Sequence, residues 1–275
     1  MPGMTFSLWT CRATFLARKR VNFPVFVSNS FRGVLGYQLD GKFFRPRAVS
    51  GPSGLRDRPR PFVIRAAHLE GRTIQEGESF ELTLNAFSEP VSDALREAVA
   101  QFGRGTGFRA ALELADWSVQ PVQLDLSPRP APPFLRLLVH TPLMMDGWNG
   151  RIPPPFSVLV ARLRDRLSAL SVFYGGGPLD FEYKDMVTRA RAVQNIAGRL
   201  TPHKSMRHSS RTGETHSLPG LTGWMEYAGP LDEFVPLLEA GYWTGIGRYT
   251  VWGHGWIEIA EPGAPEISTL AAPIS

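Results

Sequence analysis

The sequence has 275 residues, of which 43% are hydrophobic and 20% are charged, which is typical of a globular protein and excludes a disordered chain. Its net charge of +5 makes a polyanion such as nucleic acid one candidate partner, and a mildly basic enzyme is the alternative. Cys11 is the only cysteine, so one chain can form neither a disulfide nor a cysteine metal site. We predict no metal and no other cofactor. No stretch has the length and apolarity of a membrane span, so we expect a cytoplasmic protein with no membrane partner.

The first half of the chain predicts the element order β-α-β-β-α-β. We expect strands over residues 5–16, 62–69, 80–87 and 108–126, the last with an internal hairpin, and helices over 26–39 and 92–102. This order is that of a ferredoxin-like domain. The loop over residues 41–61 is rich in Gly, Pro and Arg, and it is either solvated or an RNA-gripping segment.

The second half predicts the same order again. We expect strands over residues 135–140, 186–196, 206–211, 221–227 and 251–259, and helices over 156–174 and 230–239. On the longer helix, Arg162 and Arg166 each have Asp165 within reach, which predicts ion pairs on a solvent-exposed face.

A proline-rich linker separates the two halves and sets the predicted domain boundaries. The domains are 1–126, the linker 127–133, a second domain 134–262 and a tail 263–275. The fold class is therefore α+β, with tandem ferredoxin-like (RRM-like) domains.

Two Gly-x-Gly pairs bracket a short aromatic and basic centre from Gly245 to Gly255, just before the last strand. Glycine lets another backbone approach closely, and that backbone belongs either to a phosphate chain or to the protein itself. A pyrophosphate-binding motif of a nucleotide enzyme follows a strand and opens a helix, whereas this one precedes a strand near the chain end. The position therefore argues against a nucleotide enzyme.

Several segments resemble the RAMP-type CRISPR repeat-processing endoribonucleases. These are Ser30–Gly36, Pro61–Gly71, Thr141-Pro142, Arg207–Arg211, Gly220–Gly229 with Pro230–Gly241, and the double Gly-x-Gly loop. The matches run in the family's order over roughly residues 30–259. The glycine loop is the most specific of them.

The resemblance implies two ferredoxin-like domains that bind CRISPR precursor RNA and cut it within repeats without a metal. The 2′-hydroxyl attacks the scissile phosphate and leaves a 2′,3′-cyclic phosphate and a 5′-hydroxyl. The crRNA stays bound, so other CRISPR effector subunits become potential partners. The alternative is a non-catalytic RAMP subunit that binds crRNA within an effector complex.

Such a cleavage requires a base, an acid and cations near the phosphate. The family places its catalytic group at or just after the first helix, where this chain has no histidine; the first is His68. Tyr37 and Lys42 are the catalytic candidates that this region offers. His208 lies in a competing cluster of phosphate-seeking residues.

The RNA-binding candidates fall into that cluster and the glycine loop. They are Lys204, Arg207, Ser209, Arg211, Gly245, Gly247, Arg248, Gly253, His254 and Gly255. Arginine, lysine and hydroxyl donors position phosphates, and open backbone amides accept their approach. His254 is as compatible with a structural role as with a phosphate contact.

Overall fold

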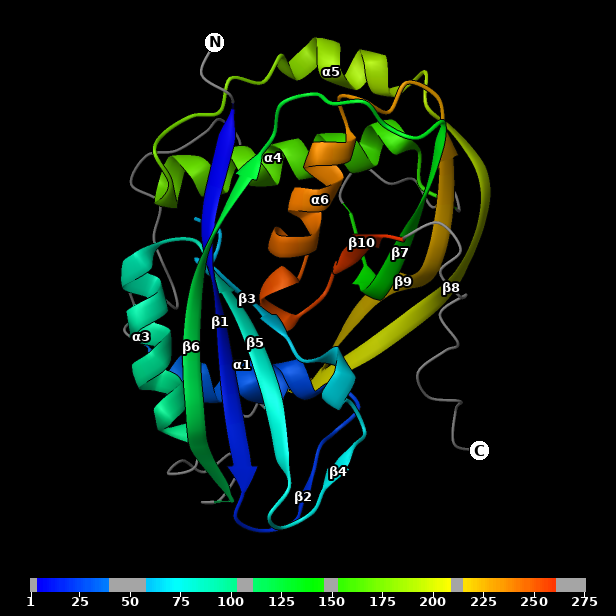
Figure 1. Ribbon diagram of the computed structural model, residues 1–275. Coiled ribbons are helices and arrows are strands. Elements are labelled where there is room, and N and C mark those ends of the chain that lie inside the picture. Colours follow the sequence, from blue (N-terminus) through cyan, green and yellow to red (C-terminus); the bar gives the residue numbers. More distant parts are fainter. Residues whose placement is uncertain (1–3, 40–57, 103–110, 146–152, 209–214, 261–275) are drawn as a thin grey trace.

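A computed structural model describes residues 4–39, 58–102, 111–145, 153–208 and 215–260 of the chain (Figure 1). The first half contains strands β1 (Thr5–Ala17), β2 (Val21–Asn22), β3 (Phe62–Arg65), β4 (Thr73–Ile74), β5 (Ser79–Ala86) and β6 (Leu112–Asp125). Its helices are α1 (Val27–Gln38) and α3 (Glu89–Ala100), with a 3₁₀ turn η1 (Ala67–Leu69).

The second half contains β7 (Phe134–Leu143), β8 (Gln194–His208), β9 (Thr215–Ala228) and β10 (Ile257–Ile259). Its helices are α4 (Phe156–Tyr174), α5 (Tyr183–Ala190) and α6 (Val235–Thr244), followed by a 3₁₀ turn η3 (Thr250–Trp252). None of the helices in the described ranges is long and apolar enough to cross a membrane.

Each half forms its own four-stranded antiparallel sheet. The strand orders are β3-β5-β1-β6 and β10-β7-β9-β8, so in both sheets the first and third strands of the unit lie at the centre. Two α+β units of the ferredoxin-like type therefore follow one another, which confirms the predicted fold class. The proline-rich segment 127–133 joins β6 to β7. The predicted domain boundaries stay a prediction.

Several element predictions were wrong. The helix predicted over residues 230–239 is observed as α6, from Val235 to Thr244. The described residues 111–126 hold no hairpin, because β6 runs along β1 from Leu112 to Asp125. It is an edge strand, where Pro121 costs no ladder hydrogen bond. The helix predicted from Ser92 begins at Glu89, with Ser88 as its N-cap residue. The predicted strand 251–259 keeps only its last three residues as β10.

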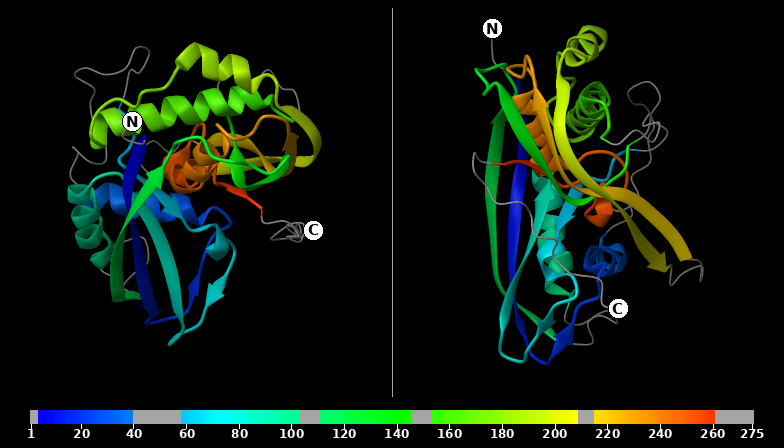
Figure 2. Two further views of the ribbon diagram at one scale, coloured as in Figure 1. Left: turned by 45° about the horizontal axis from the view of Figure 1, so that its top comes forward. Right: turned by 90° about the vertical axis from the view of Figure 1, so that its right-hand side faces the viewer.

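Residues 186–196, predicted as a strand, are divided between α5 and the start of β8. Met186 and Ala190 are spaced four apart and both buried, as on one face of a helix. Asp185 in the first turn and Arg189 in the last complement the helix dipole. α5 packs beside α4, as both views of Figure 2 show.

The apolar face of α4 carries Leu159, Leu163, Leu167 and Leu170, which repeat at helical spacing and are all buried. The polar face differs from the prediction. Arg162 pairs with Asp165 at 3.1 Å, as expected. Arg166 forms no ion pair within the described ranges, and its Nε instead donates to the Thr244 carbonyl at 2.8 Å. The prediction of an Arg166–Asp165 pair was wrong, because the glycine loop packs next to this face and α4 is not fully solvated there.

The two hydrophobic cores exchange residues across the chain. The core of the second half includes residues of the first, namely Phe6, Leu8, Val63, Phe87 and Leu126. In return, Val251 packs in the core of the first half. The glycine loop that precedes β10 is therefore placed by both halves of the molecule.

The strands β8 and β9 form a ribbon that reaches beyond the rest of the second sheet (Figure 2). β7 pairs with β9 only as far as Leu221, whereas β8 continues to pair with β9 down to Thr215. The predicted basic cluster lies at this end of the ribbon.

Candidate nucleic-acid interface

The glycine loop, residues 245–255, is folded back on itself. α6 ends at Thr244, and Gly245 leaves the helix with φ 68°. The Ile246 amide then donates to the Gly255 carbonyl at 2.9 Å, which joins the two ends of the loop. The Ile246 side chain has no solvent exposure. The loop is thus a closed structure anchored by an apolar residue.

The end of β7 receives the loop. The Arg248 amide donates to the Met144 carbonyl at 2.7 Å, and the Gly255 amide donates to the Pro142 carbonyl at 3.0 Å. Gly255 has φ +68°, and a Cβ there would overlap the Ile246 carbonyl. The Thr-Pro pair noted in the sequence therefore lies where the loop docks, with the Thr141 hydroxyl accepting from the Trp256 amide at 2.9 Å.

The opposite side of the loop packs against the first half. A Cβ at Gly253 would lie 2.6 Å from Ser28 Oγ and 3.2 Å from the Ile64 carbonyl. The Arg32 guanidinium lies over the Trp252 ring, 4.2 Å from its centroid. Of the two alternatives for the glycines, close approach of the protein's own backbone is therefore the one that this structure contains.

His254 is enclosed by these contacts. Its side chain is 1% exposed, and its ring lies 5.2 Å from that of Phe26 and 5.9 Å from that of Tyr249. No described residue exchanges a hydrogen bond with either ring nitrogen. Burial, and secondarily the charge of His203, lowers the pKa of His254 to about 4. The ring is therefore neutral near pH 7 and offers no positive charge to a phosphate in this conformation.

His203 brings β8 to the loop. It is half-buried, pairs in register with Gly220, and lies near enough to His254 to affect its pKa. The predicted residues Lys204, Arg207 and His208 follow on the same strand, opposite Pro219, His216 and Thr215. Ser209 and Arg211 lie outside the described residues. His203 is thus the part of the ribbon near the glycine loop, and the prediction of one RNA-binding surface stays a prediction.

Of the predicted catalytic residues, Tyr37 lies away from the loop contact on α1. Tyr37 belongs to the last turn of α1, and Lys42 lies outside the described residues. Ser28, which contacts Gly253, is nine residues earlier on this helix, or about 13 Å along its axis. The structure therefore places Tyr37 and the loop contact at opposite ends of α1.

Sequence reasoning missed two parts of this region. The stacking of Arg32 on Trp252 joins residues more than 200 positions apart, and no local pattern indicates it. His203 stands next to Lys204 in the sequence, and nothing in the sequence pairs it with His254. Among the described residues, no group of three His, Cys, Asp or Glu side chains could hold a metal.

Comparison with known proteins bears on this geometry directly. Residues 137–257 match the family model of the CRISPR-associated endoribonuclease Cas6. This range runs from β7 to β10 and contains the glycine loop, so the resemblance predicted from the sequence is confirmed. No curated protein matches the chain.

Solved Cas6 structures share the fold. A Cas6 product complex aligns with a TM-score of 0.58 at 15% identity, over 93% of this chain and 99% of that chain. Cas6 of Thermus thermophilus gives 0.55 at 15% identity, over 93% and 99%. A partial Cas6-RT-Cas1–Cas2 complex gives 0.60 at 11% identity, over 97% of this chain and 49% of that chain. The solved structures therefore show that the chain has the fold of the Cas6 proteins.

Proposed function

We propose that this protein is a metal-independent endoribonuclease that cuts CRISPR precursor RNA within its repeats, in the cytoplasm. The observation that carries the proposal is the match of residues 137–257 to the Cas6 endoribonuclease model, on a chain with tandem ferredoxin-like units throughout. The basic charge of the chain fits a polyanionic substrate.

The proposed reaction is a transesterification within the RNA. The 2′-hydroxyl loses its proton and attacks the adjacent phosphorus, the P–O5′ bond breaks, and the 5′-oxygen takes up a proton. The products are a 2′,3′-cyclic phosphate and a 5′-hydroxyl end. The nucleophile belongs to the substrate, so the protein has to orient it, move protons and stabilise the phosphorane charge.

We assign these roles to Tyr37, Lys42 and His208. The family resemblance supports the first two by position, at and just after α1. A lysine ammonium can stabilise the charge on the phosphate oxygens, and a phenol can exchange a proton. His208, at the end of β8, is the candidate whose residue type titrates near neutrality.

RNA would lie along the tip of the β8–β9 ribbon and across the glycine loop. The residues proposed to bind it are Lys204, Arg207, Ser209, Arg211, Gly245, Gly247, Arg248, Gly253, His254 and Gly255. Arg248 is the exposed member of the loop, whereas the amides of Gly253 and Gly255 donate within the protein. We therefore propose that those two glycines act by holding the shape of the loop.

We also propose that the crRNA product stays bound and that other CRISPR subunits contact the chain. Solved structures that share this fold include Cas6 product complexes and a Cas6-RT-Cas1–Cas2 complex. Retention follows if the binding surface is larger than the site of cleavage, because cutting one bond leaves most phosphate contacts in place.

A non-catalytic crRNA-binding subunit is the second candidate. One observation favours it: the chain has no histidine before His68, so the region around α1 lacks the residue best suited to proton transfer at neutral pH. This candidate shares the fold and the RNA-binding surface and differs only in cleavage.

The deciding experiment incubates the purified full chain with repeat RNA from its source organism in the presence of EDTA. The endoribonuclease predicts one cut, a 2′,3′-cyclic phosphate on the upstream fragment, and no cut in RNA with a 2′-deoxy nucleotide before that position. RNA that binds tightly but stays intact would establish the non-catalytic subunit instead. Cleavage that EDTA abolishes would contradict metal independence.

A further inference from the structure

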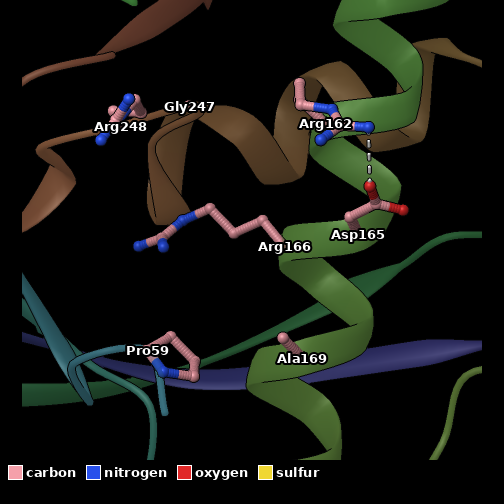
Figure 3. Close-up of a pocket in the computed structure, with 7 residues that line it drawn as sticks. All are labelled: Pro59, Arg162, Asp165, Arg166, Ala169, Gly247 and Arg248. Carbon is pink, nitrogen blue, oxygen red and sulfur yellow. Dashed lines mark ion pairs between the residues drawn. The ribbon is translucent and has the colours of Figure 1, made fainter. Parts of the chain in front are cut away.

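A pocket of about 170 Å³ lies beside the glycine loop (Figure 3). Its walls come from α4, from the loop and from the segment that leads into β3. The lining residues are Pro59, Arg162, Asp165, Arg166, Ala169, Gly247 and Arg248. Three of the seven residues carry a guanidinium group and one carries a carboxylate.

The single carboxylate of the lining is already used. Asp165 Oδ2 pairs with Arg162 Nη2 at 3.1 Å. Asp165 Oδ1 accepts from Arg164, at 3.1 Å from Nε and 2.6 Å from Nη2. Asp165 is thus already paired with two guanidinium groups, and it does not neutralise the charge of the other arginines that line the pocket.

Arg166 reaches into the pocket. Figure 3 shows its side chain extending from α4 into the space between Gly247 and Pro59. Its contacts in the described part of the chain are the Thr244 carbonyl and the Phe87 ring, 5.9 Å from the guanidinium carbon, and neither is an anion. Burial lowers the pKa of Arg166 to about 10, so it remains a cation at neutral pH. Among the described residues, this cation has no countercharge.

Further arginines surround this position. Arg65 is 5% exposed, and the Arg166 charge adds to the burial that lowers its pKa to about 9. Its Nη2 donates to the Tyr242 carbonyl at 2.6 Å, but its Nε and Nη1 find no acceptor among the described residues. Arg58 and Arg60 flank Pro59, and both leave a buried Nε equally unpartnered in that part of the chain.

A buried guanidinium donor without an acceptor is costly. Among the lining residues, the buried Nε of Arg162 finds no acceptor in the described part of the chain, so an anion in the pocket would accept from Arg162 and offset the charge of Arg166. Guanidinium forks match the tetrahedral oxygens of a phosphate better than a point charge does. The exposed Arg248 connects the pocket to the glycine loop, where the proposed RNA path lies.

We propose that this pocket, between α4, the glycine loop and the segment before β3, binds a backbone phosphate of the RNA. The proposal rests on the proposed function for the identity of the polyanion. It extends the RNA path from the ribbon and the loop onto the outer face of α4. A phosphate contact carries no sequence information, so the pocket adds affinity for any RNA that reaches it and fixes the position of the strand.

The test compares RNA binding by the full chain and its R162Q/R166Q variant over a series of salt concentrations. We expect the variant to bind repeat RNA about 10-fold more weakly at about 0.1 M salt. The slope of log affinity against log salt should fall by about 0.7–0.9 for each phosphate that the variant no longer binds. The matched control is R189Q, which removes an arginine that already pairs with Glu233 and Glu182 on α5's side of the molecule.

A second arm separates RNA from free phosphate as the source of the anion. Inorganic phosphate should raise the melting temperature of the wild-type protein and not of the variant, and it should compete with RNA only weakly. Loss of this stabilisation with unchanged RNA affinity would assign the pocket to free phosphate and overturn the proposal. Unchanged affinity and unchanged salt slope would overturn it as well.

The single variant R162Q repeats the test if the double variant does not fold, because the Arg162–Asp165 ion pair is partly exposed to solvent. All of these readouts measure binding. If the wild type binds RNA through the pocket and never cuts it, the proposal of an endoribonuclease is wrong and the proposal of a phosphate-binding pocket is supported. If the wild type cuts RNA and the variants bind RNA as well as the wild type does, the proposal of a phosphate-binding pocket is wrong and the proposal of an endoribonuclease is supported.

Discussion

The two sides of the glycine loop are built for different tasks. The packed side comprises Gly253 and Gly255, which press against α1, β3 and β7, together with the enclosed His254; the loop amides, including that of Arg248, donate within the protein. On the other side, Gly247 and Arg248 border a pocket whose arginines outnumber its carboxylates. One part of the glycine loop therefore packs closely against the rest of the protein, and another part borders a positively charged pocket. Glycine content indicates the first property, and only neighbouring side chains indicate the second.

The largest expected effect is on the packed side. G255V places a Cβ into the Ile246 carbonyl and imposes φ +68° on a β-branched residue, so we expect a loss of about 3–5 kcal/mol in the free energy of unfolding. Urea unfolding measures it. A stability within about 1 kcal/mol of wild type would show that the loop can shift away from β7.

The next largest effect concerns the proposed cleavage chemistry and leaves both sides of the loop intact. We expect K42A to slow single-turnover cleavage of repeat RNA at least about 100-fold and to change the dissociation constant less than about 3-fold. The reason is that this lysine is assigned to charge stabilisation in the transition state. Equal losses in binding and rate would instead place Lys42 on the RNA-binding surface.

His254 tests the packed side through pH. Its pKa of about 4 in the folded protein lies below the ordinary value of 6.5, so the unfolded chain binds a proton more readily. Stability from this residue is therefore complete above pH 6.5 and is lost as the pH falls from 6.5 towards 4, by about 2 kcal/mol at pH 5.

The control for this prediction is H254L, which keeps an apolar group of similar size and cannot titrate. The difference between the unfolding free energies of the two proteins should change by that amount between about pH 8 and pH 5. Other titrating groups are common to both proteins and cancel in the difference. A difference that does not vary with pH would mean that the ring is protonated in the folded state too.

The smallest expected effect concerns the contact between Arg32 on α1 and Trp252 in the glycine loop. R32A removes the guanidinium over Trp252, and we expect a loss of about 1 kcal/mol in unfolding free energy. G33A is its matched control on the same helix, where a Cβ meets nothing within 4 Å; we expect it to stabilise by about 0.5–1 kcal/mol. Urea unfolding measures both. A destabilised G33A would reveal a close neighbour of α1 outside the described residues.

The sequence predicted those parts of the fold that depend on local periodicity. The leucines of α4 repeat at helical spacing, and the predicted helix 156–174 has the observed ends. α5 was missed because its apolar residues, Met186 and Ala190, are too few to outweigh the strand-like run that follows them. The predicted order of elements along the chain indicated ferredoxin-like units, and the observed strand orders fit that fold.

The candidate site was less accessible to prediction because it is assembled from distant segments. The arginine pocket combines residues near positions 59, 162–166 and 247–248, and each of them alone looks like an ordinary basic surface. Arg166 was assigned to Asp165 because the two are neighbours in sequence on a face predicted to be solvated. Only the position of the glycine loop shows that Arg166 turns to the pocket instead.

The exchange of residues between the two cores has a consequence for how the molecule comes apart. Phe6, Leu8 and Leu126 belong to the core of the second half, and Val251 belongs to that of the first. Neither half can lose its structure without exposing apolar side chains of the other, so the chain should melt in a single cooperative transition. Cutting it within the proline-rich segment 127–133 would leave two fragments with unfilled cores, which should recover their stability only by reassociating.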